Sequence, residues 1–308
     1  MTFEENVFPF LKRTMDMGHT CALATLIHID GSSPRPVGSQ IGIKDTGDAV
    51  GMITGGCAER AIIAEALACL KTGTDKIVRY GSGSPYLDVV LPCGSGIDVL
   101  LTTTNCADLI DFATIAEKAR RPFWLSLETK TNQLTASYEK PAEGSFVQEM
   151  LPPYRLLVFG EGPNLSSFTR VANAAGFEVL AYSPDTECLD DTQSLGVMST
   201  HITKSTDFAE LPIDPWSAVI TLFHEHDWET NLLQAALNSK AHYIGALGSR
   251  RTHNERLATL SRLPPMNRSP DDIQGPVGLA IGAKNPQEIA VSILAEIIAH
   301  RSGWAVGK

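Results

Sequence analysis

Positive charge is in the minority in this sequence: 25 Lys and Arg residues stand against 35 Asp and Glu residues, a formal net charge of −10 over 308 residues. Binding to nucleic-acid phosphates requires clustered positive charge, so this balance argues against electrostatically driven nucleic-acid binding. The sequence also lacks an uninterrupted apolar run of the ~20 residues that a membrane-spanning helix needs. Its first ten residues contain two acids and no basic segment. We therefore expect no signal peptide, no membrane association and a cytoplasmic protein.

Cysteine patterns typical of metal sites are missing as well. The six cysteines form neither a Cys-x-x-Cys pair nor a zinc-like spacing. We expect free thiols in a reducing compartment and no metal site. Hydrophobic residues make up 43% of the chain and charged residues 19%, which is enough apolar material for a large core. The length suggests about two domains.

Composition divides the chain into three parts. Residues 1–105 are rich in glycine and small apolar residues, whereas 106–150 is more polar and contains two alternating segments around 130–132, a pattern that predicts a β-hairpin. From 151 to 308, apolar runs alternate with helical stretches, which favours a parallel sheet covered by helices. We therefore expect an α/β fold throughout. A smaller N-terminal α/β lobe would be joined through a connector with a hairpin to a Rossmann-like parallel-sheet domain.

Individual elements can be predicted from periodicity and end signals. Apolar runs predict strands at 21–29, 39–44, 48–54, 96–104, 156–160, 177–183, 217–223 and 242–247. Helical spacing predicts an alanine-rich helix at Ala58–Leu70 closed by Gly73, and another helix at 164–175. A last helix runs from an Asn285 cap to Gly303. Its predicted buried stripe consists of Ile289, Ile293, Ile297 and Ile298.

Cys57 is a candidate reactive cysteine. It follows Gly55 and Gly56 and directly precedes the alanine-rich helix, with Glu59 two residues further on. The positive end of a helix and unpaired backbone N–H groups favour a thiolate. The two glycines would let a ligand approach the backbone closely. A small buried cysteine in a tight turn is the alternative. Cys93, in the segment LPCGSG, has a similar glycine-flanked setting.

The loop DGSSPRPVGSQ places two hydroxyls, on Ser32 and Ser33, beside the guanidinium of Arg35. Pro34 and Pro36 stiffen this loop. Such a loop suits an anionic, oxygen-rich ligand. A structural turn with a solvated arginine remains the alternative.

A glycine turn opens the C-terminal half. Gly160 and Gly162 follow a predicted strand and precede a helix, so that helix N–H groups can be presented to a phosphate. Leu165 occupies the third glycine position of the dinucleotide fingerprint, and the next strand ends in Ser183 instead of an acid. The pattern supports a Rossmann-like domain better than it supports NAD binding.

Two later strand ends also carry polar residues, at the edge where open parallel sheets bind ligands. The cluster His224–Asp227 does not have the one-face geometry of a helical pair of metal ligands, so we predict no metal there. Ser249, Arg250 and Arg251 begin a helix and predict a phosphate site. A solvated helix start is the equally weighted alternative.

Together, the segments GSSPRPVGS, GGCAE, the Cys-Gly of LPCGSG, LLVFGEGP, YIGALGSRR and PVGLAIGAKNPQEIAVSILAEII resemble, in this order, the XdhC/CoxI family of molybdenum-hydroxylase maturation factors. The resemblance implies an accessory protein that binds molybdenum cofactor (molybdopterin), supports its sulfuration and delivers it to a xanthine-dehydrogenase-like molybdenum hydroxylase. Such a protein is a cofactor chaperone more than a turnover enzyme. Its partners would be the apoenzyme and a cysteine-desulfurase-type sulfur donor, and we expect a homodimer.

The resemblance matches Cys57 and Glu59 to the family's Gly-Gly-Cys motif, Cys93 to its Cys-Gly motif and Arg35 to its Pro-Arg loop. Cys57 and Glu59 are therefore the predicted catalytic residues. The predicted cofactor-binding residues are Arg35, Gly55, Gly56, Cys93, Gly160, Gly162, His224, Ser249, Arg250 and Arg251. We expect the Cys57 turn and the two arginines to face one cavity. Alternative functions are an NAD(P)-dependent oxidoreductase with a degenerate Rossmann fingerprint, and a docking protein whose cysteines are structural.

Overall fold

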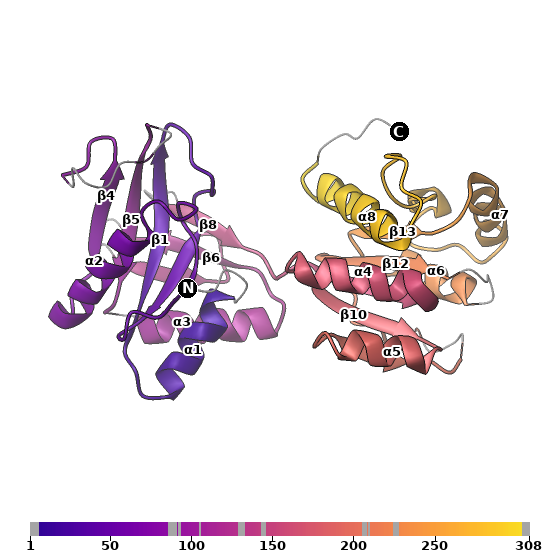
Figure 1. The fold of residues 1–308 in the computed structure, drawn as a ribbon, viewed down its shortest axis with the longest axis horizontal. Helices are drawn as coiled ribbons and strands as arrows, with labels where there is room; N and C mark the ends of the chain where they lie inside the picture. The colour runs from indigo at the N-terminus through magenta and orange to yellow at the C-terminus, as the bar shows by residue number, and fades with distance from the viewer. Residues whose placement is uncertain are drawn as a thin grey trace. The chain divides into compact units, whose positions relative to one another are not determined.

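The computed structural model describes residues 6–85, 91, 94–104, 106–128, 133–142, 146–204, 208, 210–223 and 228–303. The chain forms two compact units, Met1–Pro152 and Pro153–Lys308 (Figure 1). None of the helices in the described ranges has the length and apolar character needed to cross a membrane.

The N-terminal unit is built on a five-stranded antiparallel sheet with the order β3-β2-β1-β5-β4. Its strands are β1 (Cys21–Asp30), β2 (Gln40–Lys44), β3 (Ala49–Gly51), β4 (Lys76–Gly81) and β5 (Gly96–Thr102). The four strands expected in this half are confirmed as β1, β2, β3 and β5. Strand β4 is an addition that the sequence pattern does not predict.

Both faces of this sheet are covered because its strands alternate between two apolar cores. On β1, Ala22 and Ala24 belong to the core beneath α2 (Glu59–Thr72), whereas Leu23 belongs to the opposite core, with α1 (Val7–Asp16) and α3 (Cys106–Lys118). Helix α2 ends as predicted at Gly73, whose φ of 65° is the left-handed conformation that glycine adopts readily. The ribbon shows α2 against one face of the sheet (Figure 1).

A β-bulge interrupts the alternation of β1 side chains between the two faces of the sheet. Leu26 pairs with Val99 and His28 pairs with Asp98, so Ile27 is an additional residue on β1. Ile27 packs on the α1 and α3 side, and Ile29 then packs on the α2 side. The bulge thereby reverses which residues of β1 face α2.

The predicted hairpin is confirmed as part of a three-stranded sheet with the order β7-β6-β8. Its strands are β6 (Phe123–Leu127), β7 (Leu134–Ser137) and β8 (Val147–Met150). The ring of Phe123 packs edge-on against the rings of Phe8 and Phe112, at centroid distances of 6.1 and 5.9 Å. The stretch expected as a connector thus contributes α3 and this sheet to the N-terminal unit.

The C-terminal unit holds a five-stranded parallel sheet with the order β11-β10-β9-β12-β13. Its strands are β9 (Arg155–Gly160), β10 (Glu178–Ser183), β11 (Met198–His201), β12 (Ser217–Leu222) and β13 (Tyr243–Ala246). Numbered along this unit, the order is 3-2-1-4-5, that of a Rossmann fold. The expected Rossmann-like domain is confirmed. The partly exposed edge strand β11 is again an addition.

Helices cover both faces of the parallel sheet. One core contains residues of α4 (Gly162–Ala174), α5 (Thr186–Gln193) and α8 (Pro286–Arg301), and the other contains residues of α6 (Glu229–Asn238) and α7 (Arg250–Leu260). Helix α8 lies beside α4 (Figure 1). A 3-10 turn, Pro270–Asp272, follows α7.

The start of α8 agrees with its sequence signals. The Asn285 side chain accepts a hydrogen bond from the Glu288 N–H at 2.9 Å, as predicted for the cap. Ile293 and Ile297 are fully buried. The predicted stripe is wrong at Ile298, whose side chain is 44% exposed. Ile298 directly follows Ile297 and so lies about 100° around the helix from it, turned toward solvent.

Candidate functional site

Three loops of the N-terminal unit meet at one end of the antiparallel sheet, where β1 and β3 end and β5 begins. Strands β1 and β5 are antiparallel neighbours that pair Asp30 with Gly96, so the loop after β1 and the loop before β5 leave the sheet side by side. The turn between β3 and α2 joins them. These loops enclose a cavity of about 410 Å³. Its lining residues are Ser32, Ser33, Pro34, Thr54, Cys57, Leu91, Ser95 and Ile97.

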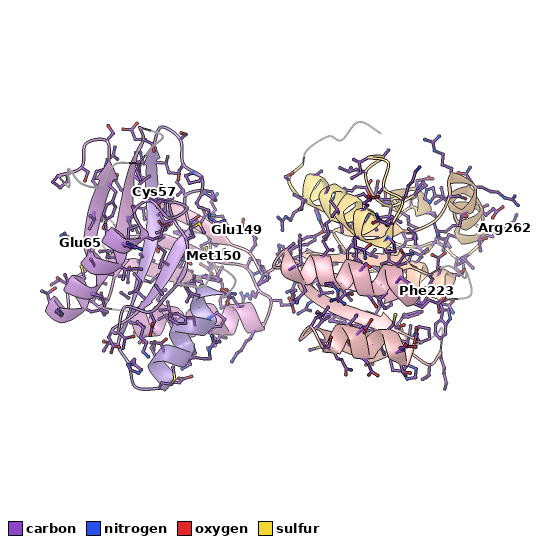
Figure 2. The ribbon with its side chains drawn as sticks, in the orientation of Figure 1. Cys57, Glu65, Glu149, Met150, Phe223 and Arg262 are labelled. Carbon is purple, nitrogen blue, oxygen red and sulfur yellow. The ribbon has the colours of Figure 1, made fainter. Side chains whose placement is uncertain are left out.

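The turn before Cys57 depends on glycine. Gly55 and Gly56 have φ angles of 77° and 111°, which side chains rarely permit. A Cβ on Gly55 would stand 3.6 Å from Cγ of Pro34, so the turn packs directly on the loop after β1. Cys57 lies before the first turn of α2, whereas Glu65 lies further along the helix (Figure 2).

Glu59 holds this turn from within. Its side chain is only 2% exposed, although it is the first residue of α2. Its Oε1 accepts hydrogen bonds from the N–H groups of Ile53 (3.2 Å) and Thr54 (2.6 Å). Its Oε2 accepts from the N–H of Gly56 (2.8 Å) and the hydroxyl of Thr54 (2.5 Å). The carboxylate therefore fixes the backbone that presents Cys57.

These hydrogen bonds set the ionisation of Glu59. Burial alone would raise the pKa of its carboxyl, but the hydrogen bonds from the Thr54 side chain and from backbone N–H groups outweigh burial and lower the pKa below its usual value. Glu59 is thus an ionised carboxylate whose acceptor positions are used within the turn. This geometry suits the positioning of Cys57; the predicted catalytic role of Glu59 stays a prediction.

Cys57 combines exposure with a place in the cavity. Its thiol is free and exposed, whereas the other described cysteines, Cys21, Cys69, Cys106 and Cys188, are buried. The Glu59 carboxylate beside it places negative charge at the start of α2, where a helix favours anions. The thiol is therefore available to a ligand, with the serine hydroxyls of the lining nearby. No group of three or more metal-binding side chains lies among the described residues.

Two further predicted residues of this unit lie elsewhere or outside the description. Arg35 does not line the Cys57 cavity; it lines another cavity, of about 520 Å³, together with Gln148 and Glu149. Glu149 is labelled on the small sheet in Figure 2. Cys93 falls outside the described residues. Their roles in cofactor binding stay predictions.

The glycine turn of the C-terminal unit lies at the switch point of the sheet, where β9 neighbours both β10 and β12. A Cβ on Gly160 would approach Cβ of Leu222 to 2.9 Å, so close strand packing requires glycine there. Gly162 begins α4 with a φ of 63°. Leu165, at the third glycine position, is fully buried. Gly160 thus permits close strand packing and Gly162 supplies the left-handed residue that starts α4, while their predicted role in cofactor binding stays a prediction.

The predicted arginine pair is separated by the structure. Ser249 caps α7 by accepting a hydrogen bond from the Thr252 N–H at 3.1 Å. Arg250 lines a cavity of about 570 Å³. Arg251 does not line it and instead pairs with Glu255 at 2.8 Å, with 88% of its side chain exposed. His224 and the rest of 224–227 fall outside the described residues.

The sequence does not predict one buried ion pair at the rim of the parallel sheet. Glu229, the first residue of α6, is paired with Arg256 of α7 at 3.0 Å, and both side chains are almost fully buried. The Thr221 hydroxyl also donates to Glu229 (3.2 Å), and Arg256 donates to the carbonyl of Leu247 (2.8 Å). Charge spacing gives no signal for this pair, because its members are 27 residues apart on two helices.

Comparison with known proteins assigns both units to one family. The model of the XdhC and CoxI family matches residues 15–81, and the model of the XdhC Rossmann domain matches residues 156–297. The molybdenum cofactor insertion chaperone PaoD of Escherichia coli is 31% identical over 299 residues, which cover 96% of this chain and 88% of PaoD. The chain belongs to the XdhC/CoxI family.

Two further similar proteins extend the comparison. A Bacillus subtilis protein, named as a probable subunit of xanthine dehydrogenase, is 24% identical, with 98% of this chain and 99% of that protein covered. A crystal structure described as a xanthine dehydrogenase from Bacillus halodurans superposes with a TM-score of 0.78 at 22% identity, covering 98% of this chain and 97% of that one. The fold is therefore shared along almost the whole chain. The family match at 15–81 contains both the Cys57 turn and the loop after β1.

Proposed function

We propose that this chain binds molybdenum cofactor as cargo in the Cys57 cavity and delivers it to a molybdenum hydroxylase apoenzyme. The observation that carries the proposal is the meeting of three loops, far apart in sequence, around one exposed thiol. A relative of 31% identity bears the name of a molybdenum cofactor insertion chaperone, which supports this function. Cytoplasmic delivery is part of the proposal and agrees with the free thiols.

The chemistry of the cavity suits this cargo. Molybdopterin carries a dithiolene, a ring system edged with hydrogen-bonding groups, and a phosphate. A thiol at Cys57 would contact the metal centre or its sulfur, and the hydroxyls of Ser32, Ser33 and Ser95 would meet polar edges of the ring. Pro34 and Ile97 supply apolar surface that keeps water away from the labile part of the cofactor.

We further propose that the cofactor is sulfurated while bound, with a cysteine-desulfurase-type protein as the sulfur donor. The exposure of Cys57 supports this step, because a donor protein must reach the bound cofactor. The order is then binding, sulfuration and transfer to the apoenzyme. The chain would act stoichiometrically on each cofactor molecule, as a chaperone and not as a turnover enzyme.

The test is the metal and pterin content of protein purified from a host that makes molybdopterin. We expect Cys57→Ser to retain about a tenth of the wild-type cofactor or less, since each loss of about 1.4 kcal/mol in contact energy weakens binding tenfold. Cys69→Ala is the matched control, because Cys69 is a buried cysteine on α2, the helix that Cys57 precedes. Equal cofactor content and equal activation of the apoenzyme by Cys57→Ser and wild type would remove Cys57 from the mechanism.

A nicotinamide-dependent oxidoreductase is the second candidate, favoured by the Rossmann strand order. The residues at the end of β10 argue against this function. The Ser183 hydroxyl is buried and accepts the Asp185 N–H at 3.0 Å, and the Asp185 carboxylate caps α5, so neither is placed to hold a ribose. Fluorescence titration with NADH and NADPH distinguishes the two functions. Tight stoichiometric binding of either would favour the oxidoreductase.

A further inference from the structure

The cavity that Arg250 lines, of about 570 Å³, lies wholly within the C-terminal unit, between α7, α8 and the segment 275–283. Its size falls in the range of small-molecule sites, about 300–1,000 Å³, and is too large for a bare phosphate ion. Neither Gly160 nor Gly162 lines it. It adjoins the edge strand β13, two positions along the sheet from β9, and is thus separate from the usual nucleotide site of this fold.

The floor of this cavity is held rigidly by hydrogen bonds. The N–H of Val277 donates to the carbonyl of Ala246 on β13 (3.1 Å), and the N–H of Gly278 donates to Oε2 of Glu296 on α8 (2.8 Å). The hydroxyl of Tyr243 donates to the same carboxylate oxygen at 2.6 Å. Glu296 is only 6% exposed. The segment is therefore fixed to both β13 and α8, and these contacts set the floor of the cavity.

Glycines keep the cavity open. A Cβ on Gly275 would lie 2.1 Å from Nδ1 of His253, and a Cβ on Gly278 would lie 2.5 Å from Oγ of Ser292. Gly278 also has a φ of 101°. His253 and Ser292 both line the cavity, so a larger residue at either glycine would displace a polar group of the lining.

One part of the lining offers positive charge and N–H donors to an anion, from largely exposed residues of α7 and the segment 280–283. The guanidinium of Arg250 forms no hydrogen bond or ion pair with any residue that the structure describes. The N–H groups of Ala280, Gly282 and Ala283 likewise have no hydrogen-bond acceptor within the described ranges. A planar cation together with free backbone N–H groups is a favourable arrangement for a phosphate.

The rest of the lining fits a ring with polar edges. Glu296 is a buried acceptor, and Asn254 offers an amide. Apolar surface comes from Leu247, Val277, Leu279 and Ile289. We propose that this cavity binds the phosphate monoester of a nitrogen heterocycle, with the phosphate at Arg250 and ring N–H groups directed to Glu296. The ligand that we assign to this cavity is a free nucleotide; the pterin cofactor, which the proposed function places in the Cys57 cavity, has the same two chemical parts, and the experiment separates them.

Adjacent arginines provide a matched test. The probe is GMP, whose base carries N–H donors, titrated by calorimetry into the full-length protein. We expect Arg250→Ala to weaken GMP binding at least tenfold and Arg251→Ala to leave it unchanged, because Arg251 pairs with Glu255 outside the cavity. Thermal unfolding checks that both variants fold. Glu296→Gln should weaken GMP binding more than binding of inorganic phosphate.

The two sources of the ligand are separated by measuring pterin in the same variants after purification. A lower pterin content in Arg250→Ala alone identifies the cofactor as the ligand, whereas weakened GMP binding with unchanged pterin identifies a nucleotide. The proposal is overturned if Arg250→Ala and Arg251→Ala behave alike in both measurements. It is also overturned if the wild-type protein does not bind GMP at millimolar concentration and Arg250→Ala keeps the wild-type pterin content. Retention of cofactor by Cys57→Ser contradicts the proposed function without affecting this result.

Discussion

Two buried glutamates, one in each unit, are the first residues of their helices, and the charge of each carboxylate is balanced by a different kind of partner. Glu59 of α2 and Glu229 of α6 are each 2% exposed. Glu59 is balanced by neutral donors, three N–H groups and one hydroxyl, all within six residues of it. Glu229 is balanced by the guanidinium of Arg256, 27 residues away.

The difference concerns what each carboxylate organises. The bonds of Glu59 are local, so they shape one turn and leave the neighbouring Cys57 exposed. The pair of Glu229 and Arg256 joins α6 to α7 and to the end of β13 through the carbonyl of Leu247. A buried charge can therefore specify either the backbone of a site or the packing of the elements around it. Substitutions at the two glutamates should therefore differ in the size of their effect on stability.

The largest expected effect is the loss of one partner of the buried pair. Glu229→Ala should lower the free energy of unfolding by about 3–5 kcal/mol, because the charge of Arg256 would remain buried without its partner. Urea unfolding of the full chain measures this change. The double variant Glu229→Leu/Arg256→Met should recover most of the loss, since apolar residues of similar size replace the pair. A loss below about 1 kcal/mol in the single variant would show that the pair does not organise this region.

A smaller, pH-dependent effect is expected at Glu59. Glu59→Gln should lower the free energy of unfolding by about 1–3 kcal/mol at neutral pH, because a neutral amide replaces the charged carboxylate that accepts these hydrogen bonds. The folded-state pKa of Glu59 lies below its unfolded value of 4.5, so its contribution is full above that pH and is lost as pH falls through the folded pKa. Urea unfolding from pH 7 down to pH 3 should show wild type and variant converging in acid. A difference that stays constant with pH would contradict this account.

The smallest effect is expected at the exposed pair of Arg251 and Glu255. Both side chains are largely in water, where such pairs contribute little. Arg251→Ala should therefore leave the urea midpoint unchanged within measurement error. A clear loss of stability in this variant would mean that α7 depends on its surface charges as well as on Arg256.

Sequence patterns predict the elements better than they predict the site. The parallel strands are continuous apolar runs and the capped helices have distinct end residues, so most of them can be located in advance. Strand β4 escapes prediction because Arg79 interrupts its apolar pattern; the structure pairs Arg79 with Asp30 at 3.0 Å. Strand β11 escapes it because the segment MSTH is polar and lies at a sheet edge.

The composition of the cavities cannot be read from sequence, because it depends on strand register and on helical phase. Ser33 and Ser95 come together because β1 and β5 pair in one particular register, and Cys57 joins them because the Gly55 turn packs against Pro34. Arg250 and Arg251 are adjacent in sequence but point in directions about 100° apart on α7, so only one of them lines a cavity. The prediction that Cys57 and these arginines face a common cavity stays a prediction.

The bulge in β1 has a practical meaning for redesign of the Cys57 cavity. With Ile27 in place, the residues after it are half a period out of phase with those before it, and Ile29 is directed to the α2 core. Deleting that residue would make the strand regular, with Leu26 still opposite Val99 and His28 still opposite Asp98, so Ile29 would keep its place on the α2 side. The deletion would instead remove the Ile27 side chain from the α1 and α3 core and the local bend of the bulge, so the loop after β1 would leave the sheet at a different angle. Deleting any other single residue of the strand would turn the residues after it to the opposite face, so the loop can be lengthened or shortened without this effect only beyond Asp30.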